Sequence, residues 1–256
     1  MKHTDKRAQE LARIEAMQLR TRQRLAVQQR RVDERFERMR ERLAKKYGEP
    51  SDSQQRIIDA ALELLKEDGL GNITLRKLAD RLDLRAPALY WHFKSKEELV
   101  DYMAEAILAR EFHELKPRQD DQSWQDWLTD HMTRLRRAML AYPDGARVVA
   151  GAHLYPAVTL AQSLETGLLS LSTAGIDVKA ARQIMTTATA YTFGYVIEEQ
   201  AAPTAEQLAG FDLKAFLEPY PIMAEALDDI DRGPDARDKD FLRGLEYLIQ
   251  GAGHTG

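Results

Sequence analysis

The sequence predicts an all-α protein. Apolar residues recur at spacings of three and four along most of the chain, as on the buried face of an amphipathic helix. Ser, Thr or Asp residues that can cap a helix precede many of these segments, and Gly or Pro residues follow them. No segment gives a strand signal. With 256 residues, 44% of them apolar, the chain can bury a core in one large helical domain or two smaller ones.

Composition narrows the kinds of site and location that we expect. No apolar run approaches the roughly 20 residues that span a bilayer, and the charged amino terminus has no apolar segment of the signal-peptide type behind it. We therefore expect a cytoplasmic protein without a membrane partner. The absence of cysteine excludes disulfides, thiol catalysis and Cys-based metal sites, which leaves only a His/carboxylate metal site open.

The first part of the chain is basic and is predicted to be helical. Residues 4–46 contain no Gly or Pro and consist mainly of good helix formers, which favours one long helix. Residues 1–50 hold 15 Lys/Arg against 8 Asp/Glu, a net charge of +7, whereas the rest of the chain carries −11. The apolar stripe of this helix is too interrupted for a coiled coil. Three interpretations stay open: packing on the body or on a dimer mate, a basic arm on DNA phosphates, and a frayed tail.

Two short helices separated by a tight break are predicted after the breaker cluster YGEPSD, residues 47–52. Thr74 can cap the first helix, residues 75–82. Residues 83–85 turn the chain, and Pro87 fits the first turn of the second helix, residues 86–92, where its missing N–H is not needed. This is the geometry of a helix-turn-helix, in which the second helix enters the major groove of DNA.

The other helices are expected from the same capping and breaking signals. Ser53 should cap a helix that ends at residue 68 before Gly69, and Ser95 should cap a helix over residues 96–114. Ser123 should cap the next helix, residues 124–141. Four further helices are expected over 146–150, 158–174, 177–200 and 222–230, and a final helix over 240–250. Residues 201–213 and the segment DRGPDARD, residues 231–238, are expected to be loops.

The residues around the helix-turn-helix resemble a known family. The run AALELLKEDGLGNITLRKLADRLDLRAPALYWHFKSKEELVD, residues 60–101, is similar to the DNA-binding domain of the tetracycline repressor (TetR) family. Four later segments resemble, in the right order, parts of the ligand-binding domain of tetracycline repressors: SWQDWL at Ser123, DGARV at Asp144, FGYVIEEQ at Phe193 and FLRGLEYLIQG at Phe241. The resemblance covers about residues 53–251. It implies three parts: the basic extension 1–50, a helix-turn-helix domain 51–115, and a helical ligand-binding and dimerisation domain 116–256.

The resemblance also implies a function. A protein of this type is a ligand-responsive transcriptional repressor that binds a palindromic operator in double-stranded DNA as a homodimer and is released by a small-molecule inducer. The resemblance places the dimer interface on residues 177–200 and 240–250, which are rich in small residues. Two alternatives are a constitutive DNA-organising protein without an inducer and a helical enzyme. We expect no enzyme, because the sequence shows no Gly-rich phosphate loop, nucleophile elbow or paired metal motif.

By position in the family motif, the resemblance assigns DNA contacts to nine residues: Arg76, Arg85, Ala86, Pro87, Ala88, Tyr90, Trp91, His92 and Lys96. Their chemistry suits this role, because Arg76 can read guanine bidentately and Tyr90 can hold a phosphate. Trp91 stays open between a core position and a contact to the DNA backbone. Lys96 and Arg85 stay open between a DNA contact and a plain surface charge.

Three of these positions depart from the tetracycline repressors. Ala86 and Ala88 replace a glutamine and a threonine of the recognition helix, and Arg85 replaces an acidic residue before them. The framework of the motif is unaffected, since alanine is a good helix former. The resemblance therefore implies that this chain reads a different operator.

The resemblance also outlines a ligand pocket with an apolar lining and a few polar anchors. Its expected members are Phe112, His131, Leu135, Val149, His153, Leu164, Thr187, Tyr191 and Glu198. Ordinary core packing is the alternative for the apolar members. Phe112, His131 and Leu135 replace a histidine, an asparagine and a phenylalanine of the family, which implies a different ligand.

The metal site of the tetracycline repressors is altered in the same way. Val149 stands at the position of the histidine that coordinates the magnesium–drug complex. The nearest histidine, His153, lies in a stretch two residues longer than its counterpart, and Glu198 retains the family's glutamate. A hard cation would have one carboxylate and a displaced imidazole, so we expect no magnesium–tetracycline and no other cofactor.

Overall fold

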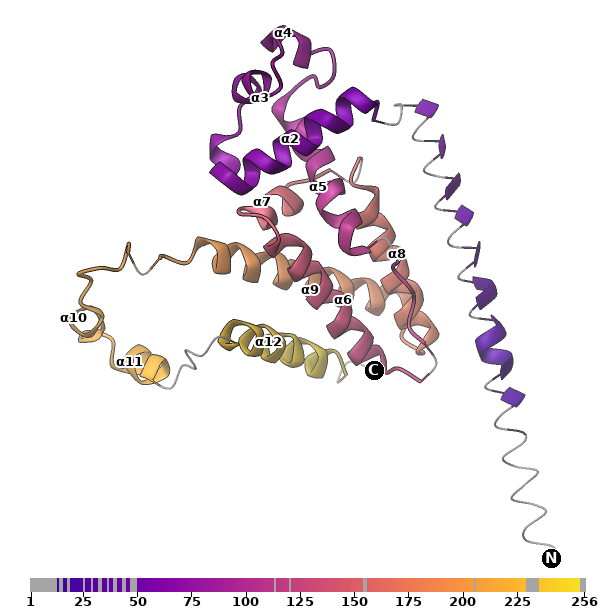
Figure 1. Ribbon diagram of the computed structural model, residues 1–256. Coiled ribbons are helices and arrows are strands. Elements are labelled where there is room, and N and C mark those ends of the chain that lie inside the picture. Colours follow the sequence, from indigo (N-terminus) through magenta and orange to yellow (C-terminus); the bar gives the residue numbers. More distant parts are fainter. Residues whose placement is uncertain are drawn as a thin grey trace, which may run out of the picture.

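The computed structural model describes most of the body of the chain and part of the basic extension (Figure 1). The described body residues are 50–112, 114–119, 121–153, 156–204, 206–228 and 235–253. In the extension they are 13, 16–17, 19–24, 26–28, 30–31, 34–35, 37–38, 41–42 and 45–46. Within these ranges the regular elements are all helices and none is a strand, as the sequence predicts.

The end of the molecule that contains the predicted helix-turn-helix, here called the head, starts with α2 (Asp52–Asp68), the 3-10 turn η1 (Leu70–Asn72) and α3 (Leu75–Arg81). The expectation that Ser53 caps the first of these helices was wrong. Ser51 is the cap: its hydroxyl accepts from the Gln54 amide, and the Gln54 side chain accepts from the Ser51 amide. This reciprocal pair, a capping box, satisfies two otherwise unpaired N–H groups and fixes the helix start two residues earlier than expected.

The second helix of the motif, α4 (Ala86–Leu89), is shorter than the expected 86–92. After Leu89 the chain tightens, because the amides of Trp91 and His92 donate to carbonyls three residues back, those of Ala88 and Leu89. The Phe93 amide still donates to Leu89 at 2.9 Å. Residues 90–92 are thus a tight turn that brings the chain to Ser95, the expected cap of the next helix.

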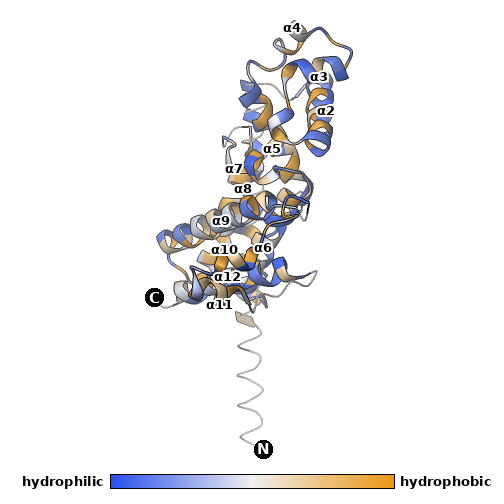
Figure 2. Cartoon of the chain, turned by 90° about the vertical axis from the view of Figure 1, so that its left-hand side faces the viewer, coloured by the Kyte–Doolittle hydropathy of each residue, from blue (hydrophilic) through white to orange (hydrophobic). Residues whose placement is uncertain are grey.

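The body is built around α5 (Lys96–Phe112), which packs against α2 of the head and against α6 (Trp124–Leu140), α7 (Gly145–Ala150) and α8 (Val158–Thr173). Then α9 (Val178–Ala201) packs across α6, α7 and α8. The cap at Ser123 lies where the sequence predicts it, whereas Asp177, the expected first residue of its helix, is the cap of α9. Figure 2 shows an elongated molecule with α3 and α4 at one end.

The last part of the chain differs most from expectation. A short helix, α10 (Leu213–Leu217), follows the connection after α9, and together with α11 (Pro221–Asp228) it projects from the body (Figure 1). The final helix, α12 (Ala236–Gly253), begins four residues before the expected 240. Its first turn is held by the body, since the Tyr195 hydroxyl donates to the Arg237 carbonyl and Arg136 pairs with Asp238 at 2.7 Å. These tertiary contacts override the turn-forming composition of DRGPDARD.

The described residues of the extension are all helical and all exposed. Its apolar side chains Met17, Leu19 and Val27 are at least half exposed. The described part therefore does not pack on its own body, whereas a dimer mate or DNA stays open as a partner. The other residues of the expected helix 4–46 lie outside the described residues. Among the described helices, none is both long enough and apolar enough to cross a bilayer.

Candidate DNA-binding and ligand sites

A buried framework fixes the helix-turn-helix. Leu78 of α3, Leu89 of α4 and Phe93 after it are almost fully buried and hold the two helices together. Between the helices, Asp83 adopts the left-handed conformation with φ 54°, which short polar side chains tolerate. The Leu84 amide then donates to the Ala79 carbonyl at 2.9 Å and closes the turn. The side chains on the opposite side of α4 are therefore presented in a fixed arrangement.

Most residues predicted to contact DNA are exposed on this framework. Arg76, Arg85, Pro87, Tyr90 and Trp91 are exposed, whereas Ala88, His92 and Lys96 are half-buried. Trp91 is 89% exposed, which excludes the core interpretation within this subunit. Ala86 is the first residue of α4, and its side chain lies outside the described part of the structure. The exposed aromatic and cationic groups can reach a nucleic acid without any rearrangement of the fold.

A cleft of about 550 Å³ gathers several of these side chains. Arg76 and Tyr90 line it together with Lys96, and Lys94 and Thr74 complete it. The Lys96 ammonium also donates to the Leu70 carbonyl at 3.2 Å, which ties η1 to the start of α5. Three cations around one cleft suit a DNA phosphate. Lys94 is absent from the predicted set, although its place beside Ser95 in the segment KSK was an available signal.

The centre of the predicted ligand pocket is a buried aromatic cluster. His131 is 2% exposed; its ring stacks on Trp127 at 4.7 Å and meets the edge of Phe112 at 5.2 Å. Its Nε2 lies 2.7 Å from the Ser163 hydroxyl. Leu135 and Val149 are buried in the same core. The structure thus brings four predicted pocket residues into one packed core and adds Trp127 and Ser163, which the sequence did not single out.

The charge state of His131 follows from its burial. Desolvation, with a further effect of the Arg134 charge, lowers its pKa from 6.5 to about 3. The imidazole is therefore neutral at pH 7, with one nitrogen able to donate a hydrogen bond and the other able to accept one.

Of the other predicted pocket residues, Leu164 and Tyr191 are partly buried and pack against the same core. Leu164 on α8 is half-buried, and Glu198 on α9 is exposed. Thr187 lines a groove between α9 and α12. Tyr191 stacks on Phe241 of α12 and donates its hydroxyl hydrogen to the carbonyl of that residue at 3.0 Å.

His153 has a different partner from the one that a metal site would require. Its Nδ1 lies 3.0 Å from the buried carboxylate of Asp101 on α5, while 76% of its side chain is exposed. Among the described residues no three His, Asp or Glu side chains come together in a way that could hold a metal ion. The buried hydrocarbon of Val149 has no atom that can ligate a cation. The residues present therefore do not fit a magnesium–tetracycline complex.

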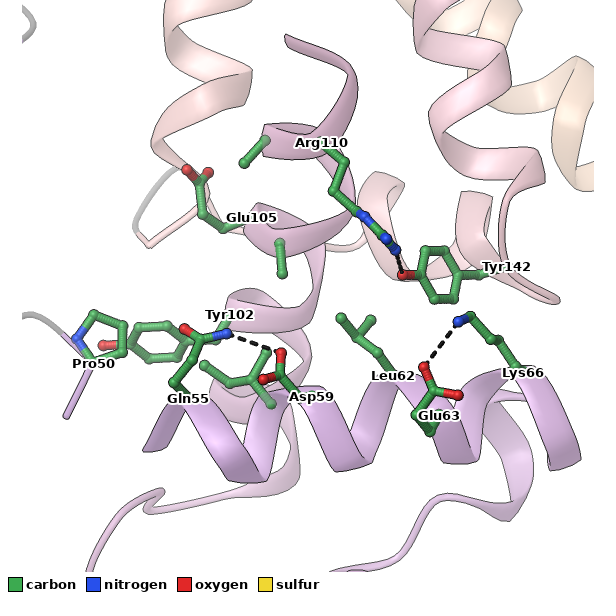
Figure 3. A pocket seen from close by; sticks show the side chains of 13 residues that line it. Pro50, Gln55, Asp59, Leu62, Glu63, Lys66, Tyr102, Glu105, Arg110 and Tyr142 are labelled. Carbon is green, nitrogen blue, oxygen red and sulfur yellow. Dashed lines mark hydrogen bonds and ion pairs between the residues drawn. The ribbon is translucent and has the colours of Figure 1, made fainter. Parts of the chain in front are cut away.

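The head meets the body at a corner formed by the turn between α6 and α7. The Tyr142 ring lies between Arg110, which donates to its hydroxyl, and Lys66, whose ammonium lies 5.3 Å from the ring centre (Figure 3). Asp144, left-handed with φ 56°, accepts from the Leu70 amide of η1 at 3.0 Å. Beside these contacts a groove of about 540 Å³ is lined by residues of α2 and α5. The junction therefore combines the apolar packing of α2 on α5 with a few polar contacts around this groove.

Comparison with known proteins identifies the family of the chain. Residues 57–103 match the family model of bacterial regulatory proteins of the tetR family, and residues 116–255 match that of the tetracyclin repressor-like C-terminal domain. The chain is 39% identical over 197 residues to the class A tetracycline repressor protein from transposon 1721 of Escherichia coli, covering 76% of this chain and 88% of that protein. The chain belongs to the TetR family.

Solved structures of TetR-family proteins agree with this assignment. A possible TetR-family transcriptional regulator from Streptomyces coelicolor A3(2) matches with a TM-score of 0.68 and 29% identity, over 79% of this chain and 99% of that one. TetR(class A) in complex with 5a,6-anhydrotetracycline and magnesium matches with a TM-score of 0.56 and 33% identity, over 78% of this chain and 96% of that one. As a TetR-family member, the protein is a DNA-binding transcriptional regulator with a helical C-terminal domain for ligands.

Proposed function

We propose that the protein is a homodimeric repressor that reads its operator through α3 and α4 and is released by an uncharged aromatic molecule rather than by magnesium–tetracycline. The observation that carries the DNA part is the exposed row formed by Arg76, Tyr90 and Trp91 over a buried framework. Two such heads in one dimer suit two half-sites about 34 Å apart, or a multiple of that distance.

The residues of the recognition element favour a particular kind of base contact. Arg76 and Arg85 are exposed and can each donate two hydrogen bonds to a guanine, the commonest specific contact in the major groove. Pro87 is exposed and can touch a thymine methyl group. The replacement of a glutamine by Ala86 removes a side chain that could bind adenine. We therefore propose an operator whose half-sites are richer in guanine contacts than those of the tetracycline repressors.

A surface for the second subunit lies along α9 and α12. A groove of about 340 Å³ runs between them, with Ile184 and Thr187 on one side and Leu248 on the other. Nearby, Val178 and Tyr247 expose more than half of their surface. A contiguous apolar surface of this kind is unfavourable in water and marks an interaction site. A second copy of the same two helices would cover it with an isologous interface.

The chemistry of the His131 cluster supports the proposed ligand class. The neutral imidazole and the Ser163 hydroxyl offer one hydrogen-bonding pair, while Trp127 and Phe112 offer aromatic faces and edges. These four side chains carry no charge themselves, and the nearby Arg134 guanidinium, 5.9 Å from the centre of the Phe112 ring, already donates to the Glu111 carbonyl at 2.9 Å. A flat, uncharged molecule with one polar group that enters between these side chains would match them.

One experiment tests the DNA part of the proposal. Selection of bound fragments from random DNA should yield a palindromic operator. Arg76→Ala should then lower the affinity for this operator by about tenfold or more, because a bidentate contact contributes about 1–3 kcal/mol. Arg81→Ala is the matched control, since Arg81 lies on the same helix, has the same charge and pairs with Glu67 at 2.7 Å. Equal operator affinity of Arg76→Ala and wild type, in folded dimers, would refute the assignment.

The ligand part is tested separately with the operator complex. A screen of uncharged aromatic compounds, run with and without magnesium, should find release that does not depend on the metal. Release only by magnesium–tetracycline would contradict the proposed ligand class. The absence of release by any compound would favour the constitutive DNA-binding alternative.

A further inference from the structure

The basic extension carries a regular stripe of cations. Successive cations of the stripe are alternately seven and four residues apart: Arg13, Arg20, Arg24, Arg31, Arg35, Arg42 and Lys46. This spacing is an 11-residue repeat, or about 3.67 residues per turn, close to the 3.6 of a straight helix. At about 100° per residue, the seven side chains fall within an arc of about 80°. A cation therefore recurs on one side of the helix over a length of about 50 Å.

The structure supports both the helix and the accessibility of the stripe. All seven residues are described, and each of them is helical and exposed. Nearby acidic residues lie to one side: Glu34, Glu37 and Glu41 are rotated from the centre of the stripe by about 80–140°. Arg38, which shares the stripe's face, makes only a long ion pair of 3.7 Å with Glu34. The basic face is thus separated from the acidic one along the same helix.

The extension joins the head next to the element that reads DNA. It is followed directly by Ser51, the cap of α2. In the first turn of α2, the Gln54 side chain donates to the His92 carbonyl at 3.1 Å. His92 belongs to the turn that ends the recognition element. The start of α2, where the extension joins the head, therefore lies beside the part of the head that would contact the duplex.

We propose that this stripe binds the phosphate backbone of DNA that flanks the operator. Charge favours DNA as the partner of the stripe, because the extension carries +7 whereas residues 51–256 carry −11, so the extension concentrates the positive charge that attracts a polyanion. Arginine, which forms six of the seven positions, binds phosphate with a planar fork of donors and keeps its charge at every physiological pH. A helix of about 50 Å can follow about 15 base pairs of duplex at 3.4 Å each. The family models begin at residue 57, so this contact would be an addition to the shared architecture.

The test uses the full chain and a mixed-sequence duplex of about 40 base pairs that contains no operator. The proposal rests on the DNA-binding function, but this probe makes the result independent of which operator the head reads. Because each phosphate contact contributes about 0.9 to the slope of log affinity against log salt, Arg24→Gln/Arg31→Gln/Arg35→Gln/Arg42→Gln should lower that slope by about 3 to 4. Glutamine preserves helix propensity, which circular dichroism can check.

A matched pair of variants separates the stripe from net charge. Arg24→Gln/Arg31→Gln removes two stripe residues and should lower the slope by about 2. Arg22→Gln/Arg30→Gln removes two cations of the same region that lie off the stripe, about 120–160° from its centre, and should change the slope much less. Equal effects of the two pairs would show that only the net charge matters and would overturn the stripe.

Two further results would also overturn the proposal. One is an unchanged slope in the fourfold variant while the operator is still bound, which leaves the proposed function intact. The other is a loss of binding to vesicles of equal phosphatidylserine and phosphatidylcholine without a change on DNA, which would assign the stripe to a membrane surface. A different result would separate the two proposals. If the stripe variants lower the slope but the protein selects no operator, the proposed repressor function is refuted and the proposed DNA contact of the stripe is retained.

Discussion

The imidazole of His131 lies between Trp127 and Ser163, where burial lowers its pKa to about 3. The unfolded chain takes up a proton at this side chain below about pH 6.5, whereas the folded chain does so only near pH 3. Its contribution to stability is therefore complete above pH 6.5 and is lost as the pH falls toward 3. The imidazole thus stays neutral in the folded core down to about pH 3, while the stability of the fold decreases below pH 6.5.

Replacement of His131 by asparagine tests this linkage. Between pH 6 and pH 4 the free energy of unfolding of the wild type should fall by about 1.4 kcal/mol per pH unit more than that of His131→Asn, because the variant has no proton to take up at this site. Urea unfolding at several pH values measures the difference. Parallel stability curves for the two proteins would show that the imidazole is protonated in the folded state.

The elements of this fold were predictable where local chemistry decides them. Thr74, Ser95 and Ser123 each cap the helix that the sequence assigned to them. The prediction failed where contacts with distant residues determine a helix boundary. The early start of α12, for example, is stabilised by Tyr195 and Arg136, which lie on other helices. The recognition helix α4 ended early for a related reason, since Leu89 and Phe93 are both buried in the core and fix the turn between them.

The contact between α9 and α12 gives a sharp prediction for one glycine. A Cβ atom on Gly244 would lie 2.1 Å from the Tyr191 hydroxyl oxygen, so Gly244→Ala must displace that ring and its hydrogen bond to Phe241. We expect a loss of about 1–3 kcal/mol in thermal or urea unfolding. Gly251 on the same helix has nothing within 4 Å, and Gly251→Ala should be neutral or slightly stabilising. Equal stability of the two variants would contradict this packing.

At the scale of the whole molecule, the head and body are joined by a junction that the sequence did not reveal. Asp144 could be read as a turn residue, but its bond to the Leu70 amide spans 74 positions of the chain. The places of the predicted pocket residues were also not evident from the sequence: His131 lies in the core, whereas Thr187 lies in the groove between α9 and α12. Spacing within one helix can be read from sequence, whereas contacts between distant helices need the fold.

The Asp144 contact can be tested by comparing two substitutions. Asp144→Ala removes the acceptor and places alanine at φ 56°, and the two effects together should cost about 1–3 kcal/mol. Asp144→Asn keeps an acceptor oxygen, and asparagine tolerates this backbone conformation, so the loss of stability should be smaller. Hydrogen exchange at residues 66–72 should become faster mainly in Asp144→Ala. Equal protection in both variants would show that the contact does not hold the head to the body.

The exposure of Trp91 has a practical consequence for experiments. The chain has three tryptophans, and they occupy different surroundings: Trp91 stands in water on the DNA-facing turn, whereas Trp127 is stacked on His131 inside the body. Emission from an exposed indole shifts and is quenched when a surface covers it, while emission from the buried one responds to changes within the core. The protein thus carries native fluorophores at both of its binding regions, and Trp91→Phe would leave only Trp124 and Trp127, both on α6 of the body, to report on the ligand.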